Sequence, residues 1–419
     1  MSGDEKGLAS SKKLFLVGYG VWLVFRLSRL SLLAFPDGSP LNTLMHIGAL
    51  FIIVLSLAVS LVWEKNPITK RILPFLALFI VGVVQELLID EPMCVDLALL
   101  FLAADRVDFR KIAKYTLWIE GICCAIIVLS SLVGIIPNYY ITRSDGVVRY
   151  YLGFTYCTFL SHLFFNMVLI VLYIRRENVR YRELGLLAII DVGIFIATNS
   201  KNSFVLVLLI LLVAYCIKRA SIKRTQRPGR VVQQCARISV IVFPLLSLCI
   251  ALLYNPQSAA WRTANNFLSN RIAQTHASTE RYGFEPFGQD IDFVGNGLVA
   301  GGDGVATAEA HPDGDSNFID NSYMNVLVNN GLVVALIFWV ALICTAQRGI
   351  REDDSWLSLA LLAIAVHSLF DPQLLQLVYN TFLFIIWQEL MEFRTLFKNP
   401  VSGKGSGCQR IAGRHFAKS

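Results

Sequence analysis

The stretch DNSYMNVLVNNGLVVALIFWVAL (residues 320–342) opens with three polar residues and then becomes apolar enough to lie in lipid. Asp320, Asn321 and Ser322 are of the types that cap helix N-termini, because their side chains satisfy amide groups that a first turn leaves without partners. We therefore expect a membrane-spanning helix that begins at the membrane surface. For Asp320 two roles are open: a helix cap, or a carboxylate held at that surface for chemistry.

The composition of the whole chain is also that of a membrane protein. Of its 419 residues, 55% are hydrophobic and 16% charged, with a mean hydropathy of +0.58, whereas a soluble domain carries about 25% charged residues. The first apolar run follows Lys12 and Lys13 and continues past any plausible cleavage site, so we interpret it as a span and not as a signal peptide. The nine cysteines have no metal-ligand or redox spacing and predict no disulfide framework.

The hydropathy pattern predicts an all-α polytopic membrane protein with about twelve transmembrane helices and both termini in the cytoplasm. We expect one integral membrane domain over residues 1–419, one large extracytoplasmic loop at 256–320 after the ninth helix, and a basic cytoplasmic tail at 396–419. The expected spans are residues 14–35, 41–63, 72–89, 92–105, 115–136, 152–174, 184–199, 202–217, 238–255, 323–345, 355–370 and 375–393.

The distribution of basic residues supports this orientation. Of the 37 Lys and Arg residues, 29 fall in segments expected in the cytoplasm, as the positive-inside rule requires. Seven of them lie in residues 218–237, which we interpret as a solvated cytoplasmic loop and not as an arm that binds nucleic acid. Only six fall in external segments: Arg143, Arg149, Lys201, Arg262, Arg271 and Arg281.

Five of these external cations predict an anion-binding pocket. Arg143 and Arg149 flank RSDGVVR, Lys201 lies in the short turn ATNSKNSF, and LSNRIAQTHASTERYGFEPFG (268–288) contains Arg271 and Arg281. The planar fork of arginine and the point charge of lysine both suit phosphate. If the segments converge over the bundle, they would bind a lipid phosphate or diphosphate. The alternative is that the cations pair with the nine acidic residues of the 256–320 loop.

The order of these motifs resembles that of the Wzy-type polysaccharide polymerases, which make O-antigen, capsule and exopolysaccharide and belong to the O-antigen ligase superfamily. RSDGVVRYYLGFTY (143–156) resembles the family's external arginine stretch, and TNSKNSF (198–204) resembles its short Ser-Arg turn. LSNRIAQ…RYGFEPFG (268–288) resembles its Ser-x-Arg helix and aromatic-Gly segment. DNSYMNVLVNNG (320–331) and LVYNTFLF (377–384) resemble the motif after the large loop and the closing segment. The likeness covers roughly residues 110–390.

This resemblance implies a GT-C-like bundle and a metal-independent glycosyltransferase of the bacterial cytoplasmic membrane. Such an enzyme joins oligosaccharide repeat units carried on undecaprenyl diphosphate at the outer face. A hydroxyl of the lipid-linked acceptor attacks the anomeric carbon of the lipid-linked donor, and undecaprenyl diphosphate leaves. No metal, nucleotide or other cofactor is implied, and no nucleic acid is a partner. A flippase and a chain-length regulator are candidate protein partners.

Two other functions are weighed against this one. The first is a ligase that transfers finished glycan to a different acceptor. The second is a twelve-span polysaccharide flippase or transporter. Transporters of that size are commonly built from paired halves, and the sequence contains no such repeat.

The resemblance assigns roles to individual residues. Asp320 becomes the base or the positioning group for the acceptor, and Asn321 orients the sugar hydroxyl. We expect the helix dipole to keep Asp320 ionised and to make it a weaker base. Asp320 stands where the ligases have histidine, so His311 and Glu280 are alternative bases. The expected diphosphate-binding residues are Arg143, Arg149, Lys201, Arg271 and Arg281.

Two further expectations concern Lys201 and two histidines. Lys201 replaces the arginine of the short turn, which weakens bidentate phosphate recognition there. His162 and His367 fall inside apolar spans, and we expect them to be satisfied bundle residues and not metal ligands.

Overall fold

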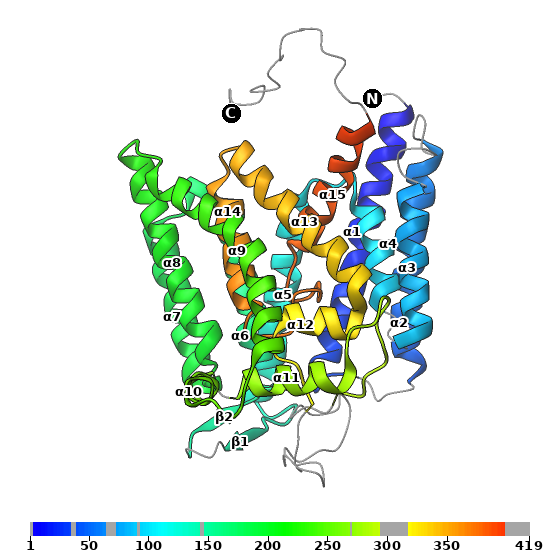
Figure 1. Cartoon of the computed structure of the whole chain (residues 1–419). Helices are drawn as coiled ribbons and strands as arrows, with labels where there is room; N and C mark the ends of the chain where they lie inside the picture. Colours follow the sequence, from blue (N-terminus) through cyan, green and yellow to red (C-terminus); the bar gives the residue numbers. More distant parts are fainter. Residues whose placement is uncertain are drawn as a thin grey trace, which may run out of the picture.

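The computed structural model is a bundle of long helices (Figure 1). It describes residues 3–34, 39–63, 73–89, 93–142, 146–268, 270–293 and 317–398. Within these ranges the strands form one antiparallel hairpin of β1 (Tyr140–Thr142) and β2 (Val148–Tyr150), in which Tyr140 pairs with Tyr150. The predicted all-α fold class is therefore confirmed.

The helices follow the chain in a simple order. Those before the hairpin are α1 (Gly3–Arg29), α2 (Pro40–Val62), α3 (Leu73–Ile89), α4 (Met93–Ala104) and α5 (Phe109–Leu132). Those after it begin with α6 (Phe159–Arg175), α7 (Tyr181–Thr198), α8 (Lys201–Ile222) and α9 (Arg227–Leu253). The remainder are α10 (Ala259–Phe267), α11 (Arg271–Tyr282), α12 (Ser322–Asn325), α13 (Gly331–Arg351), α14 (Ser355–His367) and α15 (Leu383–Lys398).

Seven helices in the described ranges are long and apolar enough to cross a membrane. Each of the twelve expected spans overlaps a helix, but α15 begins only at Leu383 of the expected 375–393. In addition, α4 has only 12 residues and rises about 18 Å, less than a hydrocarbon core of about 30 Å. The opening stretch of the sequence forms a helical segment, Ser322–Arg351, that is long and apolar enough to span a membrane, and in it a π-helical turn, Val326–Asn330, joins α12 to α13. The full count of twelve crossings stays a prediction.

The outer faces of these helices carry large apolar side chains. Leu87 is 81% exposed, Ile196 75% and Trp118 72%. Such apolar surface is unfavourable in water and favourable in lipid. Polar groups are buried among the helices instead: the Trp22 indole donates to the Asp96 carboxylate at 2.7 Å.

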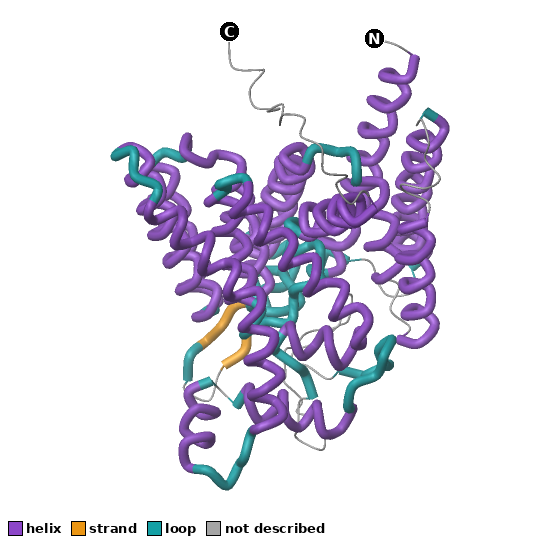
Figure 2. Tube along the Cα trace, turned by 45° about the horizontal axis from the view of Figure 1, so that its top comes forward, coloured by secondary structure: helices purple, strands orange, loops and turns teal. Residues whose placement is uncertain are grey.

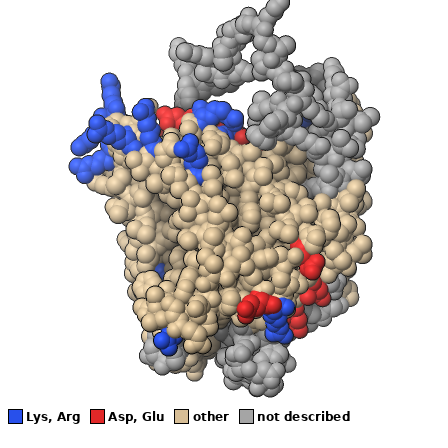
Figure 3. Space-filling view, viewed as in Figure 1, with Lys and Arg blue, Asp and Glu red and all other residues tan. Residues whose placement is uncertain are grey.

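Charged residues gather at the two ends of the bundle. In Figure 3, Lys and Arg side chains cluster at the end where α8 leads into α9, and a band of uncharged residues separates them from the opposite end. Helix α1 begins and α15 ends on the Lys- and Arg-rich side (Figure 1). This distribution matches the expected positive-inside orientation, although which side faces the cytoplasm stays a prediction.

The opposite end holds α10, α11 and the β-hairpin (Figures 1 and 2). The chain forms two helices there, α10 and α11, because Asn270 at the start of α11 adopts a left-handed φ of 66°. Residues 285–289 pack across the start of α13, where the Leu332 amide donates to the Glu285 carbonyl at 3.0 Å. Residues 294–316 of the expected large loop and most of the 396–419 tail lie outside the described ranges.

Candidate active site

A cavity of about 420 Å³ lies at the end of the bundle that holds the hairpin and α11. Segments far apart in the sequence line it: the hairpin and start of α6, the turn between α7 and α8, the break between α10 and α11, and residues next to α12 and α14. Four residues predicted from the sequence are among its lining: Arg149, Lys201, Arg271 and Asp320. The expected convergence of external cations is therefore observed for three of them.

The turn between α7 and α8 fixes two of the cations. Asn199 ends α7 in a left-handed conformation with φ 48°, so the chain reverses tightly and Lys201 becomes the first residue of α8. The Arg149 Nε donates to the Thr198 carbonyl at 2.8 Å, which ties strand β2 to the end of α7. Arg149 is thus held by a neutral carbonyl and keeps its charge for a ligand in the cavity.

Arg271 and Asp320 form an ion pair in the cavity wall. The Arg271 Nε lies 2.9 Å from the Asp320 Oδ2, and the side chains are 23% and 31% exposed. The Arg271 guanidinium also donates to the Phe370 carbonyl. The pKa of Asp320 is raised, chiefly by burial. The Arg271 guanidinium and His162 act to lower this pKa, and the Asp371 carboxylate acts to raise it. The helix dipole was expected to lower the pKa of Asp320, but burial outweighs that effect. Asp320 is therefore a stronger base than an ordinary aspartate.

The α10–α11 break places Arg271 in the cavity. The Asn265 side chain accepts from the Ala273 amide and donates to the Asn270 side chain, both at 2.9 Å. These bonds cross the break and set the direction in which α11 begins. Arg271 is the first residue of α11, so this local structure decides its position.

Several buried polar atoms in the cavity wall have no hydrogen-bond partner among the described residues: the Asn199 Oδ1, the Ser200 Oγ and the Ser203 Oγ. Ser200 is 5% exposed and Ser203 1%. A buried polar group without a partner is unfavourable by about 1–3 kcal/mol. These groups are therefore suited to a polar ligand that enters the cavity. Sequence analysis missed both serines, although the turn TNSKNSF contains them.

The other predicted site residues that the structure describes do not line the cavity. Arg143 and His311 lie outside the described residues. Arg281 is in the last turn of α11, with its guanidinium 5.3 Å from the centre of the Tyr282 ring. Glu280 is 72% exposed and pairs with His276.

Asn321, and not Asp320, caps the helix that follows. Its side chain accepts from the Met324 amide at 3.1 Å and donates to the Ser247 hydroxyl at 2.9 Å. The two roles considered for Asp320 thus belong to two neighbouring residues. Asn321 caps the helix, and Asp320 lines the cavity. The expected role of Asn321 in orienting a sugar hydroxyl gains no support from this geometry.

Asn321→Ala is expected to lower stability with little effect on activity. Loss of an N-cap side chain typically lowers the free energy of unfolding by about 1 kcal/mol. Thermal unfolding of the detergent-purified protein measures the change, with Asn266→Ala on the exposed face of α10 as the control. A large loss of activity at unchanged stability would instead place Asn321 in the site.

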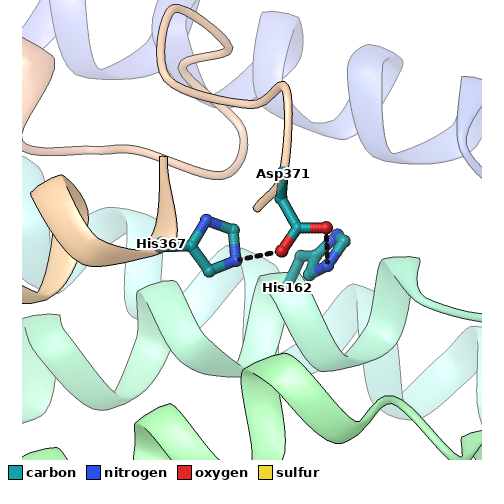
Figure 4. A group of neighbouring side chains, drawn as sticks. All are labelled: His162, His367 and Asp371. Carbon is teal, nitrogen blue, oxygen red and sulfur yellow. Dashed lines mark ion pairs between the residues drawn. The ribbon is translucent and has the colours of Figure 1, made fainter. Parts of the chain in front are cut away.

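His162 of α6, His367 at the end of α14, and Asp371 form a buried group beside the cavity (Figure 4). The expectation that both histidines are satisfied is wrong for His367, whose Nε2 has no hydrogen-bond partner among the described residues, and Asp371 was not predicted from the sequence. The His162 Nε2 lies 3.4 Å from the Asp371 Oδ1, and the His367 Nε2 lies 3.5 Å from the Asp371 Oδ2. His162 and Asp371 line the cavity. The spacing of His367 and Asp371, four residues apart where a helix ends, is the signal that could have found them.

No protein-family model matches the chain, and no curated protein or solved structure matches it. The fold and the cavity nevertheless define the class of protein to which the chain belongs. The chain is an all-helical protein with seven helices fit to cross a membrane, and a polar, cation-bearing cavity lies at one end of the bundle.

Proposed function

We propose that this chain is a polysaccharide polymerase that joins repeat units carried on undecaprenyl diphosphate. The hydroxyl oxygen of the acceptor forms a bond to the anomeric carbon of the donor. The bond from that carbon to the diphosphate oxygen breaks, and undecaprenyl diphosphate leaves with the electron pair. The acceptor's proton passes to Asp320. The reaction follows the mechanism implied by the sequence resemblance.

The observation that carries the proposal is the composition of the cavity lining. Arg149, Lys201 and Arg271 come from three separate segments and surround a space that is also lined by Asp320. Cations already in place around a leaving diphosphate stabilise the charge that develops on it. The unpartnered hydroxyls of Ser200 and Ser203 add donors for phosphate oxygens.

The Arg271–Asp320 ion pair supports a coupling between donor binding and proton removal. A diphosphate oxygen can compete with Asp320 for the Arg271 guanidinium, because arginine binds phosphate bidentately. Once Arg271 turns to the ligand, Asp320 loses the partner that opposes the rise of its pKa. Asp320 then becomes a stronger base at the moment when the donor is in place.

A second cavity, of about 320 Å³, supports binding of the uncharged sugars. It adjoins the first through one chain segment: Phe370 and Asp371 line the first cavity, and Pro372 and Gln376 line the second. Three asparagines also line it: Asn325, Asn329 and Asn330. Amides both donate and accept hydrogen bonds, as sugar hydroxyls do. Among the described residues, the second cavity is lined by one carboxylate, Asp290, and by no Lys or Arg, whereas three cations line the first. This difference fits a ligand whose anionic part lies in the first cavity and whose uncharged sugars lie in the second.

The experiment that tests this function is deletion of the gene in its native host, with surface glycan length scored on gels. We expect single repeat units at the surface while export persists, and restoration of long chains by the wild-type gene. Loss of finished glycan from lipid A or from protein, with long lipid-linked chains intact, would indicate a ligase. Absence of any repeat at the surface would indicate a flippase.

The pH dependence of the reaction tests the role of Asp320. Its carboxylate is the active form, so activity falls as the pH drops through its pKa, which burial raises above the ordinary value of 3.8. Arg271 of α11, His162 of α6 and Asp371 are the charged or titratable groups that act on it. We expect the acidic limb of undecaprenyl diphosphate release to lie above pH 3.8. Thermal unfolding at each pH is the control, and full activity down to that pH contradicts the assignment.

A further inference from the structure

We propose that His162, His367 and Asp371 bind a divalent transition-metal ion, and that zinc fits the donor set best. Two imidazole nitrogens and one carboxylate are the ligands of many zinc sites that keep a fourth position open. All three ligand atoms lie within 4.8 Å of one another. The inference concerns metal binding alone and does not depend on the glycan chemistry. It departs from the expectation, based on sequence, that these histidines bind no metal.

The distances in this group are those of ligands around an ion and not those of hydrogen bonds. Zinc bonds of 2.0–2.1 Å in a tetrahedron put neighbouring ligand atoms about 3.3–3.4 Å apart. The His162 Nε2 lies 3.4 Å from the Asp371 Oδ1, and the His367 Nε2 lies 3.5 Å from the Asp371 Oδ2. Each histidine thus faces its own carboxylate oxygen, at a separation beyond the ~2.7–3.2 Å of an ordinary N–H···O bond.

A second histidine–aspartate pair in the same bundle provides the comparison. The His46 Nε2 lies 3.0 Å and 2.9 Å from the two carboxylate oxygens of Asp96. That pair has closed to hydrogen-bond distance, whereas His162 and His367 stand back from Asp371. The contrast distinguishes a hydrogen-bonded pair from a group with room for an ion.

Two of the atoms that would bind the ion have no hydrogen-bond partner among the described residues. These atoms are the His367 Nε2 and the Asp371 Oδ2, and both residues are 7% exposed. Leaving a donor or acceptor so deeply buried without a partner is unfavourable. A metal ion would satisfy both atoms together.

The surroundings of the three residues hold them in place. The His162 Nδ1 contacts the Gln373 side-chain amide, which leaves the Nε2 to face Asp371. The His367 ring stacks on Phe165 with centroids 4.5 Å apart. The Asp371 amide donates to the His367 carbonyl at 3.1 Å, and the Asp371 carbonyl accepts from the Ser322 hydroxyl. Such outer partners orient metal-ligating histidines and carboxylates.

The position of the group gives the ion access to a ligand. His162 and Asp371 line the same cavity as Arg149, Lys201 and Arg271, so a fourth coordination position would face an anion bound there. The five charged side chains of this lining are three cations and two carboxylates, Asp320 and Asp371. A dication would raise the positive charge around that anion and act on it as a Lewis acid.

Metal content of the full-length protein tests the site. Wild-type protein purified in detergent without chelator, after growth with added zinc, is expected to contain about one zinc ion per chain. His162→Ala and His367→Ala are expected to bind zinc more than ~100-fold more weakly, since loss of even an outer partner weakens binding about 10–100-fold. Gln373→Leu is expected to fall in that 10–100-fold range. His46→Ala is the matched control and should retain zinc.

A measurement on wild-type protein alone covers the case in which the variants do not fold. Protein stripped of metal and titrated with Co²⁺ should develop the visible absorption bands of tetrahedral cobalt, and added Zn²⁺ should remove them. Zinc at no more than trace level in wild type, together with a featureless cobalt titration, overturns the proposal. Zinc retained in folded His162→Ala and His367→Ala overturns it as well. Neither readout requires glycan substrate, so each is independent of the proposed polymerase activity.

Discussion

Asp320→Asn is expected to stop chain growth while single repeat units still reach the surface. The amide keeps the size of the carboxylate and can still accept from Arg271, but it cannot take a proton from the acceptor hydroxyl. A positioned general base contributes about 10²–10⁴-fold to such a reaction, and we expect a loss of that size. The measurement is the rate of undecaprenyl diphosphate release by purified protein, together with glycan length in the native host.

The matched control for this variant is Glu280→Gln. Glu280 was an alternative base on sequence grounds, but it is 72% exposed and pairs with His276 outside the cavity. We expect Glu280→Gln to keep its activity. If Asp320→Asn produces long chains at the wild-type rate, Asp320 is not the base. If Glu280→Gln loses activity at unchanged stability, the base has been misassigned.

Arg271→Ala is expected to have the second large effect. Removal of one preorganised donor from a site of developing negative charge raises the barrier by about 2.7–4 kcal/mol, or roughly 10²–10³-fold in rate. Arg271 also pairs with Asp320 and donates to the Phe370 carbonyl, so its loss disturbs both sides of the cavity. Arg271 acts to lower the pKa of Asp320, so this pKa should be higher in the variant. As the pH is lowered, we therefore expect the residual activity of the variant to be lost at a higher pH than the activity of wild type.

Arg281→Ala is the matched control, since the same residue type lies on the same helix. Arg281 contacts the Tyr282 ring and does not line the cavity. It should lose less than ~10-fold, since an exposed cation–π contact contributes only about 0.5–1 kcal/mol. Equal losses from Arg271→Ala and Arg281→Ala would contradict the assignment of Arg271 to the cavity. Arg271→Lys separates charge from shape: it should restore part of the activity, because lysine supplies the charge without the bidentate fork.

Much of the architecture followed from local patterns. Continuous apolar runs near 20 residues determine helices, because in lipid every backbone polar group must find its partner within the same segment. The expected segments accordingly coincide with observed helices over most of the chain. The pocket cations were found for a similar reason. Arg149, Lys201 and Arg271 stand in segments that the sequence predicts to be external, where the positive-inside rule disfavours basic residues, so they were predicted as site residues.

Other features depended on contacts between distant segments. Asp320 and Asn321 are neighbours of similar type, yet Asn321 caps the helix and Asp320 meets Arg271. Which of two adjacent polar residues turns inward depends on the backbone path and on the partner opposite, and neither is encoded in spacing. Arg271 and Arg281 are likewise the same residue type on one helix, yet Arg271 lines the cavity and Arg281 contacts the Tyr282 ring.

The sequence by itself therefore determined that this is a helical membrane protein and which charged residues are out of place on its surface. Only the tertiary structure decided that Arg149, Lys201, Arg271 and Asp320 share one cavity. It alone placed His162 against His367 and Asp371, from segments about 200 residues apart. The physical reason is that hydropathy and charge act along a local segment, whereas a binding site is made by side chains whose separation in space bears no relation to their separation in the chain.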